Sequence, residues 1–347
     1  MKNFDILNIS TETIDIYKDC FNKNGSHKTK EKLTWQLLEL PIKSKYVNIA
    51  VDKETNRTAG TYAVFPIVFK IGNQNYIGSQ AIDAITDENF RGNGLYIKLA
   101  KNVYEMAKKD DVKLVFGFPN RISVHGHKNK LSWTIMDPVP FLIKPLNTQY
   151  FSKKIKLLSW FPNINIARKY KIHQSISFIC ENSFSDEVNE IWIKFSKYIK
   201  VAVVRSKEYL EWRYLKKPQE NYQIVHGYAN DGIYIGYVIY CIKEKHGGKV
   251  AYIMEYIFDP QYKSIASNLL KYACNEIIKA KADCILSWCF EHSENYLNYK
   301  SSGFYKLPEK LRPIELHFGT KAFDKSLETI ITNRNNWFLS YSESDTV

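Results

Sequence analysis

Short apolar runs separated by polar turns organise the first third of the chain. The runs cover residues 46–52, 60–71 and 76–86, with turns near Asn56 and at residues 72–75. Runs of this length bounded by Asn and Gly are typical of β-strands joined as hairpins. The pattern therefore predicts a three-stranded meander.

A helix and a fourth strand follow this meander. Apolar residues recur at Leu95, Leu99, Val103 and Met106, which is the spacing of one face of an α-helix. A further apolar run covers residues 114–118. A strand, a helix and a second strand in this order imply a parallel pair joined by a right-handed crossover.

The second half of the chain repeats this order. Three strand-like runs, a helical pattern and a last strand-like run cover residues 221–229, 233–243, 250–258, 265–277 and 284–290. The step from the third strand to the last spans 30 positions from Ile85 to Val115 and 29 from Ile257 to Leu286. Matched order and length indicate duplication. We therefore predict an α/β fold with mixed (α+β) sheets and two tandem domains, residues 1–145 and 146–347, each a β-meander followed by a βαβ step.

Composition narrows the class of protein. The chain has 347 residues, enough for two domains, and hydrophobic residues make up 45% of it. No stretch of roughly 18 uncharged apolar residues offers a membrane span, and Asp5 interrupts the place of a signal-peptide core. We expect a globular, cytoplasmic protein. The six cysteines and eight histidines show no metal-ligand spacing, so no metal site is expected.

The net charge of +13 favours polyanionic partners. Nucleic acid, an anionic membrane face and phosphate-rich small ligands all fit this charge. A Lys-rich composition by itself also produces such a value, so charge alone does not choose among them.

A glycine-containing loop stands between the third strand and the helix of the first unit. It reads Phe90-Arg91-Gly92-Asn93-Gly94-Leu95-Tyr96. Glycines let backbone amides turn toward one point, and the following helix start adds its positive dipole end, so the loop can cradle a pyrophosphate. The equivalent segment of the second unit, residues 259–267, has no glycine. We predict that only the first unit binds such a ligand.

The loop in this setting resembles that of the GNAT superfamily of acyl-CoA-dependent N-acyltransferases, which reads Gln/Arg-x-x-Gly-x-Gly/Ala at a helix start. Arg91 and Gly94 match this pattern, whereas Tyr96 replaces the last small residue. The resemblance implies that the loop binds the CoA pyrophosphate and that pantetheine lies between residues 81–85 and 114–118. The residues it implies for CoA binding are Ile85, Thr86, Arg91, Gly92, Asn93, Gly94, Leu95, Tyr96 and Asn120.

Three further phrases resemble tandem GNAT sugar N-acyltransferases of surface-polysaccharide (O-antigen, lipopolysaccharide) biosynthesis. They are residues 117–120, 209–214 and the tail 337–345. This resemblance implies transfer of an acetyl or short hydroxyacyl group from acyl-CoA to a nucleotide-linked amino sugar, with a dTDP-3-amino-3,6-dideoxyhexose as the specific candidate. An aminoglycoside, peptide or polyamine acceptor, which would need an acidic cleft, remains an alternative. A catalytically inactive, basic nucleic-acid-binding module is a remote one.

Acyl transfer to an amine needs a route for the amine proton. Asp83 is the candidate base on the strand before the loop, where period-2 alternation places it on one face with Ala81 and Ile85. His125 is a second candidate, since its ordinary pKa lies near neutrality. Glu255 mirrors Asp83 in the second unit and could hold the amine from the facing side.

Six residues at the start of the second unit are candidates for acceptor binding. Arg205, Arg213, Lys216 and Lys217 could meet a diphosphate, because guanidinium groups in particular fit phosphate oxygens. Trp212 and Tyr214 could stack on a nucleobase. A solvated basic face and a buried aromatic core are the alternative interpretations.

Overall fold

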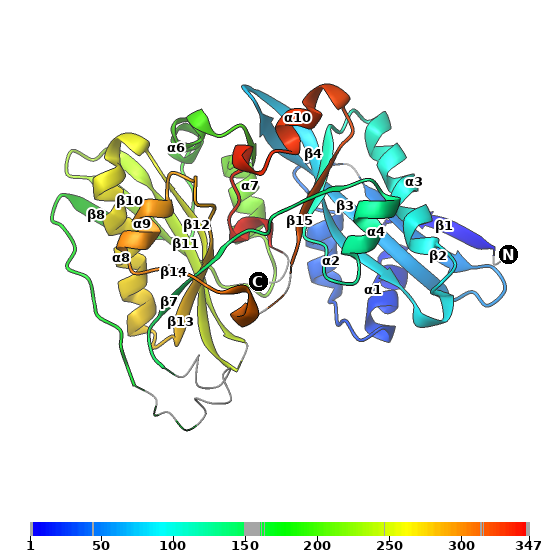
Figure 1. Ribbon diagram of the computed structural model, residues 1–347, viewed down its shortest axis with the longest axis horizontal. Helices are drawn as coiled ribbons and strands as arrows, with labels where there is room; N and C mark the ends of the chain where they lie inside the picture. Colours follow the sequence, from blue (N-terminus) through cyan, green and yellow to red (C-terminus); the bar gives the residue numbers. More distant parts are fainter. Residues whose placement is uncertain are drawn as a thin grey trace.

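The computed structural model describes residues 3–43, 45–148, 160, 162, 164–245, 247–312, 314 and 316–344. Two mixed β-sheets lie side by side with helices on their faces, as Figure 1 shows. The elements of the first half are β1 (Phe4–Asn8), α1 (Ile14–Lys23), α2 (Lys30–Leu37), β2 (Tyr46–Asp52), β3 (Thr58–Ile71), β4 (Gln74–Thr86), α3 (Leu95–Lys109), β5 (Leu114–Gly117), α4 (Val124–Lys130), β6 (Thr134–Met136) and β7 (Phe141–Pro145).

The second half begins with β8 and ends in short helical turns. Its elements are β8 (Ile176–Cys180), α6 (Glu187–Phe195), β9 (Val201–Val203), α7 (Lys207–Leu210), the π-helical turn η4 (Glu211–Leu215), β10 (Gln223–Ala229), β11 (Tyr234–Lys245), β12 (Gly248–Phe258), α8 (Lys263–Lys279), β13 (Cys284–Trp288), α9 (Tyr296–Ser301), β14 (Tyr305–Lys306), β15 (Phe318–Ala322), α10 (Glu328–Ile331) and the 3-10 turn η9 (Tyr341–Glu343). None of the helices in the described ranges is long and apolar enough to cross a membrane.

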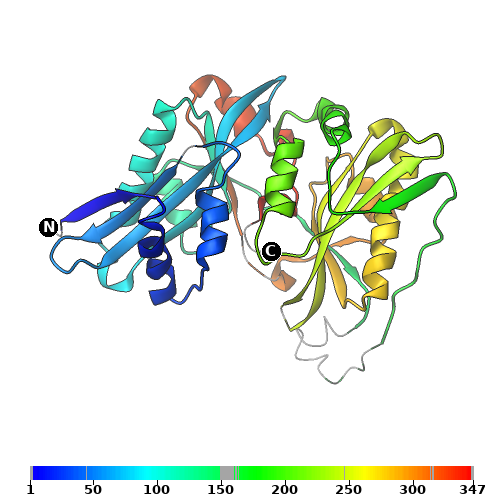
Figure 2. The ribbon, with the colours of Figure 1, turned by 180° about the vertical axis from the view of Figure 1, so that it is seen from behind.

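The first sheet has the order β1-β2-β3-β4-β5-β15-β6, with β9 paired to β3. The apolar stripe of α3, which includes Leu99 and Val103, packs on one face of it. Residues of α1, including Tyr17 and Phe21, form a separate core on the other face. The view from behind in Figure 2 shows α1 and α2 over that second face.

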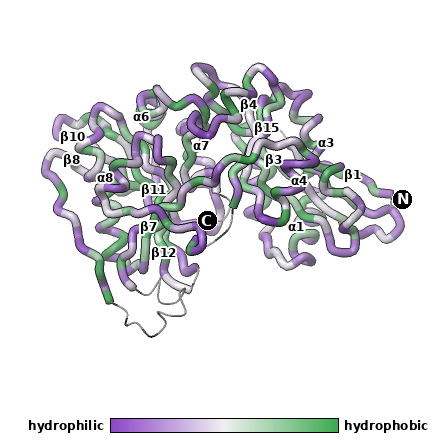
Figure 3. Tube along the Cα trace, in the orientation of Figure 1, coloured by the Kyte–Doolittle hydropathy of each residue, from purple (hydrophilic) through white to green (hydrophobic). Residues whose placement is uncertain are grey.

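The second sheet has the order β14-β7-β13-β12-β11-β10-β8 and carries α8 on one face. Its core is continuous with the interface between the two units, because one hydrophobic cluster contains Leu269 of α8, Trp35 of α2 and Phe116 of β5. The hydropathy-coloured trace in Figure 3 shows hydrophobic residues concentrated along the central strands of both sheets. The chain therefore forms two sheets around a partly shared core.

The predicted fold class is confirmed, and the duplication extends to a detail of strand pairing. The β3–β4 register shifts so that Ile82 has no partner, and the β11–β12 register shifts in the same way at Met254. Each is a β-bulge, an extra residue that locally redirects the strand. Asp83 and Glu255 each follow the bulged residue, so they occupy corresponding positions.

The two sheets exchange strands across the predicted division at residues 145 and 146. β7 lies in the second sheet, where it pairs with β13, and β15 returns to the first sheet, where it pairs with β5. Figure 1 shows both crossings. Each strand covers an edge that would otherwise expose unpaired backbone groups. The units are therefore interlocked rather than consecutive, and a single sequence boundary does not separate them.

A buried ion pair network joins the C-terminal segment to the second sheet. Arg205 is fully buried, with its Nε 2.9 Å from Oε1 of Glu255 and its Nη2 2.5 Å from Oε1 of Glu343. Its guanidinium also lies over the rings of Trp192 and Phe338. Two carboxylates thus share one cation in a fully buried site.

We expect Glu255→Gln to change how stability depends on pH. Burial raises the pKa of Glu255 to about 7; Arg205 opposes this effect and Glu343 reinforces it. Because the folded pKa lies above the ordinary value of 4.5, the free energy of unfolding should fall as pH rises from 4.5 to about 7. Glutamine keeps an acceptor for Arg205 without the titrating charge, so this fall should be smaller in the variant.

Urea unfolding of both proteins at about pH 5 and about pH 8 measures the difference. Comparison with the wild type cancels the contribution of other titrating groups. An equally steep loss of stability in Glu255→Gln would contradict the assignment of this pH dependence to Glu255.

Candidate functional site

The parallel strands β4 and β5 pair only at two positions and then diverge. The pairs are Ser79 with Val115 and Gln80 with Phe116. Beyond them lies a cavity of about 830 Å³, a size typical of small-molecule sites. We call the space between the two strands beyond Gln80 the strand gap. One wall of the cavity is β4, and the other is the end of β5 with the start of α4.

The glycine loop closes one end of this cavity. Gly92 and Gly94 have φ values of 83° and 67°, which favour glycine, and Gly94 is the N-cap residue of α3. In the described parts of the chain, no hydrogen-bond acceptor is found for the backbone amides of residues 92–97. A helix start with several unpaired amides and no capping side chain is an anion-binding arrangement.

The structure brings most of the predicted CoA-binding residues to this cavity. Ile85, Thr86, Arg91, Tyr96 and Asn120 line it. The others shape the loop: the Asn93 side chain donates to the carbonyl of Phe90 at 3.2 Å, and Leu95 is buried in the core beneath α3.

Asn120 also holds the turn after β5. Its Oδ1 accepts from the amides of Ile122 and Ser123 at 3.0 and 2.9 Å. The carbonyl end of this side chain therefore caps the turn, while the residue still lines the cavity.

Asp83 lies on the cavity wall, mostly buried and ion-paired. Nζ of Lys28 is 2.6 Å from both carboxylate oxygens, and the hydroxyl of Tyr17 donates to Oδ2 at 3.1 Å. Lys28 comes from the segment between α1 and α2. The carboxylate is therefore balanced by a cation and fixed in position by a phenol, as a buried charge requires.

The expectation that Ala81, Asp83 and Ile85 share one face of the strand is wrong for Ala81. Ala81 packs in the core under α3, on one face of the first sheet. Ile85 packs in the core under α1, on the other face, and Asp83 accepts a hydrogen bond from Tyr17 of α1. The bulge at Ile82 inserts one residue between them and so reverses the alternation.

The two histidines of α4 have different surroundings. His125 is exposed, bonds to Nδ2 of Asn129 and does not line the cavity. His127 is buried and lines it, with Nδ1 2.9 Å from the carbonyl of Ser123 and Nε2 2.9 Å from the hydroxyl of Tyr96. A role of His125 in proton transfer stays a prediction that its position does not favour.

His127 and Tyr96 are both neutral near pH 7. Burial lowers the pKa of His127, an effect opposed by its bond to the Ser123 carbonyl. Since a carbonyl only accepts, Nδ1 carries the proton and Nε2 is left to accept from Tyr96. Burial also raises the pKa of the Tyr96 phenol. The pair therefore forms an uncharged polar wall of the cavity.

Five of the predicted residues of the second unit are buried and do not face the cavity. Glu255 and Arg205 belong to the buried ion-pair network described above. Trp212 stacks on Trp35 with ring centroids 4.7 Å apart, and Tyr214 packs edge-on against Tyr222. The core alternative therefore describes both aromatic side chains.

Arg213 is buried as well and binds the chain itself. Its Nε donates to the carbonyl of Ser342 at 2.8 Å, and its Nη2 donates to that of Ser344 at 2.6 Å. The predicted contacts of Arg205 and Arg213 with a diphosphate are therefore corrected, because their guanidinium groups hold the C-terminal segment. That segment is described as far as Ser344; Asp345, the last residue of the predicted tail phrase, lies outside the described residues.

The second unit fills its equivalent of the strand gap with its own chain. Pairing of β12 with β13 ends at Ile253 and Ser287. Beyond that point Tyr341 of η9 stacks on Trp288 at 4.7 Å and meets the ring of Tyr252 edge-on at 5.4 Å. A bound ligand would have to displace this aromatic cluster.

Two features of the cavity were missed by sequence reasoning. Lys28 gave no signal, because a lysine in a polar segment far from Asp83 in sequence is ordinary. His127 was not among the predicted residues, although it lies only two positions after His125 in the segment that follows the predicted strand. The helical period of α4 decides which of the two faces inward.

Residues 10–130 match the family model described as an acetyltransferase (GNAT) domain. A comparison with curated proteins finds no related sequence. The matched residues include β4, the glycine loop, α3 and β5, which together form the cavity. The first unit therefore contains a GNAT acetyltransferase domain, and the chain is an acyl-CoA-dependent enzyme.

Solved structures with the same fold cover nearly the whole chain. Saccharomyces cerevisiae N-myristoyltransferase with bound myristoyl-CoA has a TM-score of 0.62 and 13% identity over 92% of this chain and 83% of its own. A GCN5-related N-acetyltransferase from Anabaena variabilis has a TM-score of 0.66 and 12% identity over 93% and 73%. A probable N-acyltransferase from Enterococcus faecalis has a TM-score of 0.60 and 12% identity over 93% and 73%. The likeness extends to both units of the fold.

Replacement of Gly94 should abolish CoA binding. Gly94→Glu would place a carboxylate where the loop amides meet the pyrophosphate, and like charges repel. Gly232→Glu is a matched control, because Gly232 also has a positive φ and open space for a side chain. Both variants bear similar backbone strain, so only the Gly94 variant should lose CoA affinity in calorimetry. Equal affinities of the two variants would overturn the assignment of the loop.

Calorimetry of the wild-type protein should give one CoA per chain. The strand gap of the first unit is open, whereas Tyr341 occupies its counterpart in the second. A stoichiometry of two would show that the second unit opens to admit a ligand.

Proposed function

We propose that this GNAT-type enzyme transfers an acyl group from acyl-CoA to the amine of a nucleotide-linked amino sugar. The specific candidate is a dTDP-3-amino-3,6-dideoxyhexose, with acetyl or a short hydroxyacyl group as donor. The observation that carries the reaction is the strand gap: it joins a pyrophosphate-binding loop to an ion-paired carboxylate along one strand.

The backbone of β4 offers partners for the donor. From Ala81 to Thr86, no strand of the described chain pairs with the edge of β4 that faces the strand gap. Amide groups of pantetheine can form bonds of the kind that β5 would otherwise make. The loop amides then receive the pyrophosphate, and the thioester lies deeper in the gap.

The chemical step is a direct attack of the neutral amine on the thioester carbonyl carbon. A C–N bond forms, the C–S bond breaks, and the CoA thiolate leaves. Asp83 is the proposed acceptor of the amine proton, because it is the only carboxylate among the residues described as lining the cavity. The leaving thiolate takes a proton from solvent.

The charges around the cavity support an anionic acceptor over a polycationic one. Arg91 lines the cavity, Lys28 neutralises Asp83, and the whole chain carries +13. An aminoglycoside or polyamine would need several free carboxylates, and among the described lining residues Asp83 is the sole one. The acetyltransferase domain also argues against an inactive nucleic-acid-binding module.

A screen of donors and acceptors tests the proposal. Acetyl-CoA and short hydroxyacyl-CoA donors are combined with dTDP- and UDP-linked amino sugars, an aminoglycoside and a polyamine, and release of free thiol is followed. Turnover should occur with a nucleotide amino sugar and be lost in Gly94→Glu but not in Gly232→Glu. Turnover confined to an aminoglycoside or polyamine would refute the acceptor class.

Replacement of Asp83 should slow the chemical step. If Asp83 accepts the amine proton, Asp83→Asn lowers kcat by roughly 10²–10⁴-fold, the usual effect of a positioned general base. His125→Asn should have a far smaller effect, because His125 is exposed and outside the lining. The measurement is kcat and kcat/KM against pH for both variants. Wild-type rates of Asp83→Asn across the whole profile would exclude Asp83 as the base.

A further inference from the structure

A group of basic side chains gathers where the two units meet. They come from α2, from η4 and the turn after it, and from the end of β11; we call them the lysine cluster: Lys32, Arg213, Lys217, Lys243 and Lys245. The guanidinium of Arg213 and the ammonium of Lys217 lie over the same ring of Trp35, at 5.8 and 5.6 Å. The cluster thus unites elements that are far apart in the sequence.

Glu220 is the carboxylate that pairs with two lysines of this cluster. Nζ of Lys243 is 2.6 Å from Oε2 of Glu220, and Nζ of Lys217 is 3.7 Å from Oε1 of the same residue.

Arg213 donates its hydrogen bonds to the carbonyl oxygens of Ser342 and Ser344, which carry no negative charge to neutralise it. Glu343, the carboxylate that acts on the charge of Arg213, lines the adjoining pocket but is itself paired with Arg205. Positive charge therefore predominates in this part of the described chain.

Lys32 is the member of the lysine cluster whose ammonium group can still accept an anionic partner. Its ammonium has no hydrogen bond or ion pair in the part of the chain that the structure describes, although the side chain is half-buried. Burial lowers its pKa, and Lys28, Lys243 and Arg213 act in the same direction against Glu220. An unpaired, crowded cation costs free energy, which an anion bound beside it would recover.

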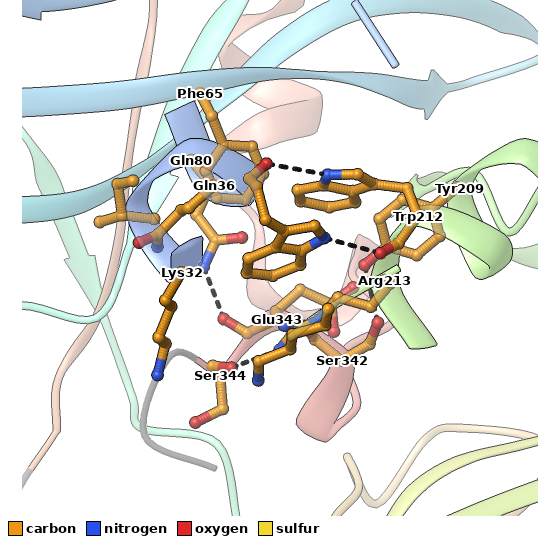
Figure 4. A pocket seen from close by; sticks show the side chains of 13 residues that line it. Lys32, Gln36, Phe65, Gln80, Tyr209, Trp212, Arg213, Ser342, Glu343 and Ser344 are labelled. Carbon is orange, nitrogen blue, oxygen red and sulfur yellow. Dashed lines mark hydrogen bonds between the residues drawn. The ribbon is translucent and has the colours of Figure 1, made fainter. Parts of the chain in front are cut away.

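The cluster adjoins the cavity of the first unit. A small pocket of about 20 Å³ is lined by Lys32, Arg213 and Lys217 together with Gln80 and Ile82. Gln80 and Ile82 also line the 830 Å³ cavity at the start of the strand gap. Figure 4 shows the Lys32 side chain extending past Gln80 toward Ser344. The pocket holds little more than one water, so a ligand would lie across its mouth.

We propose that the lysine cluster binds the phosphate or diphosphate group of the acceptor and so holds its amine at the strand gap. Ammonium groups bind phosphate as point charges, and several of them together increase both affinity and the rate of encounter. The loop at Gly94 then binds the donor pyrophosphate, while the cluster binds the acceptor phosphate from the side of the second unit. This inference rests on the proposed function; Arg213 adds its charge to the site, while its hydrogen bonds remain on the C-terminal segment.

Calorimetry on CoA-saturated protein tests the site directly. CoA is titrated first, so that the glycine loop is occupied, and inorganic pyrophosphate or dTDP is titrated next. One equivalent should bind, with affinity that falls as salt rises. Lys32→Gln should weaken this binding about tenfold, the effect expected for a lost charge-assisted contact, and leave CoA affinity unchanged.

Lys30→Gln is the matched control. Lys30 lies on the same helix, is half-exposed and pairs with Asp15 at 2.7 Å, away from the cluster. It should bind pyrophosphate as the wild type does. With an acceptor in hand, Lys32→Gln should raise KM about tenfold with little change in kcat.

The outcomes separate this inference from the proposed function. If CoA binds but pyrophosphate does not bind the CoA-saturated protein, or binds Lys32→Gln as tightly as wild type, the anion site is refuted and acyl transfer stands. If CoA itself fails to bind, the proposed function fails first. Equal weakening in Lys30→Gln would reduce the effect to general surface charge and refute the site as well.

Discussion

The divergence of β4 from β5 after Gln80 and Phe116 is the constraint on which the site depends. Backbone groups that lose a strand partner must bond elsewhere or face water. In the first unit the outer edge of β5 pairs with β15, while the edge of β4 facing the gap stays open to the cavity. A ligand with amide groups can complete this edge, and we propose that the loop at the end of β4 binds its phosphates. Binding thus follows from an interrupted sheet.

In the second unit β12 and β13 diverge in the same way, but residues of the chain itself fill the space between them. β13 pairs with β7 at its outer edge, and Tyr341 enters the space beyond Ile253 and Ser287. Arg205, held between Glu255 and Glu343, fixes the segment that carries this tyrosine. One backbone geometry therefore serves ligand binding in one copy and cohesion of the two units in the other.

The C-terminal segment also connects these two functions. Gln80, at the start of the strand gap, donates from Nε2 to the carbonyl of Glu343 at 2.5 Å. The ion-pair network of the second unit is therefore one hydrogen bond away from the cavity wall of the first. An acceptor bound across the lysine cluster, as proposed, would lie against this junction and so contact the second unit.

Local pattern determined the elements, and tertiary packing decided which side chains face the cavity. Strand and helix periodicity located β2, β3, β4, α3 and β5, and the glycines before α3 located the loop, because these are properties of neighbouring residues. Packing decided that Lys28 neutralises Asp83, that His127 rather than His125 faces the cavity, and that Arg205 and Arg213 are buried. Ile82 is an example: this bulged residue reverses the alternation of side chains along β4, and the local sequence pattern does not reveal the bulge. The exchange of β7 and β15 likewise depends on edges that exist only once both sheets have formed.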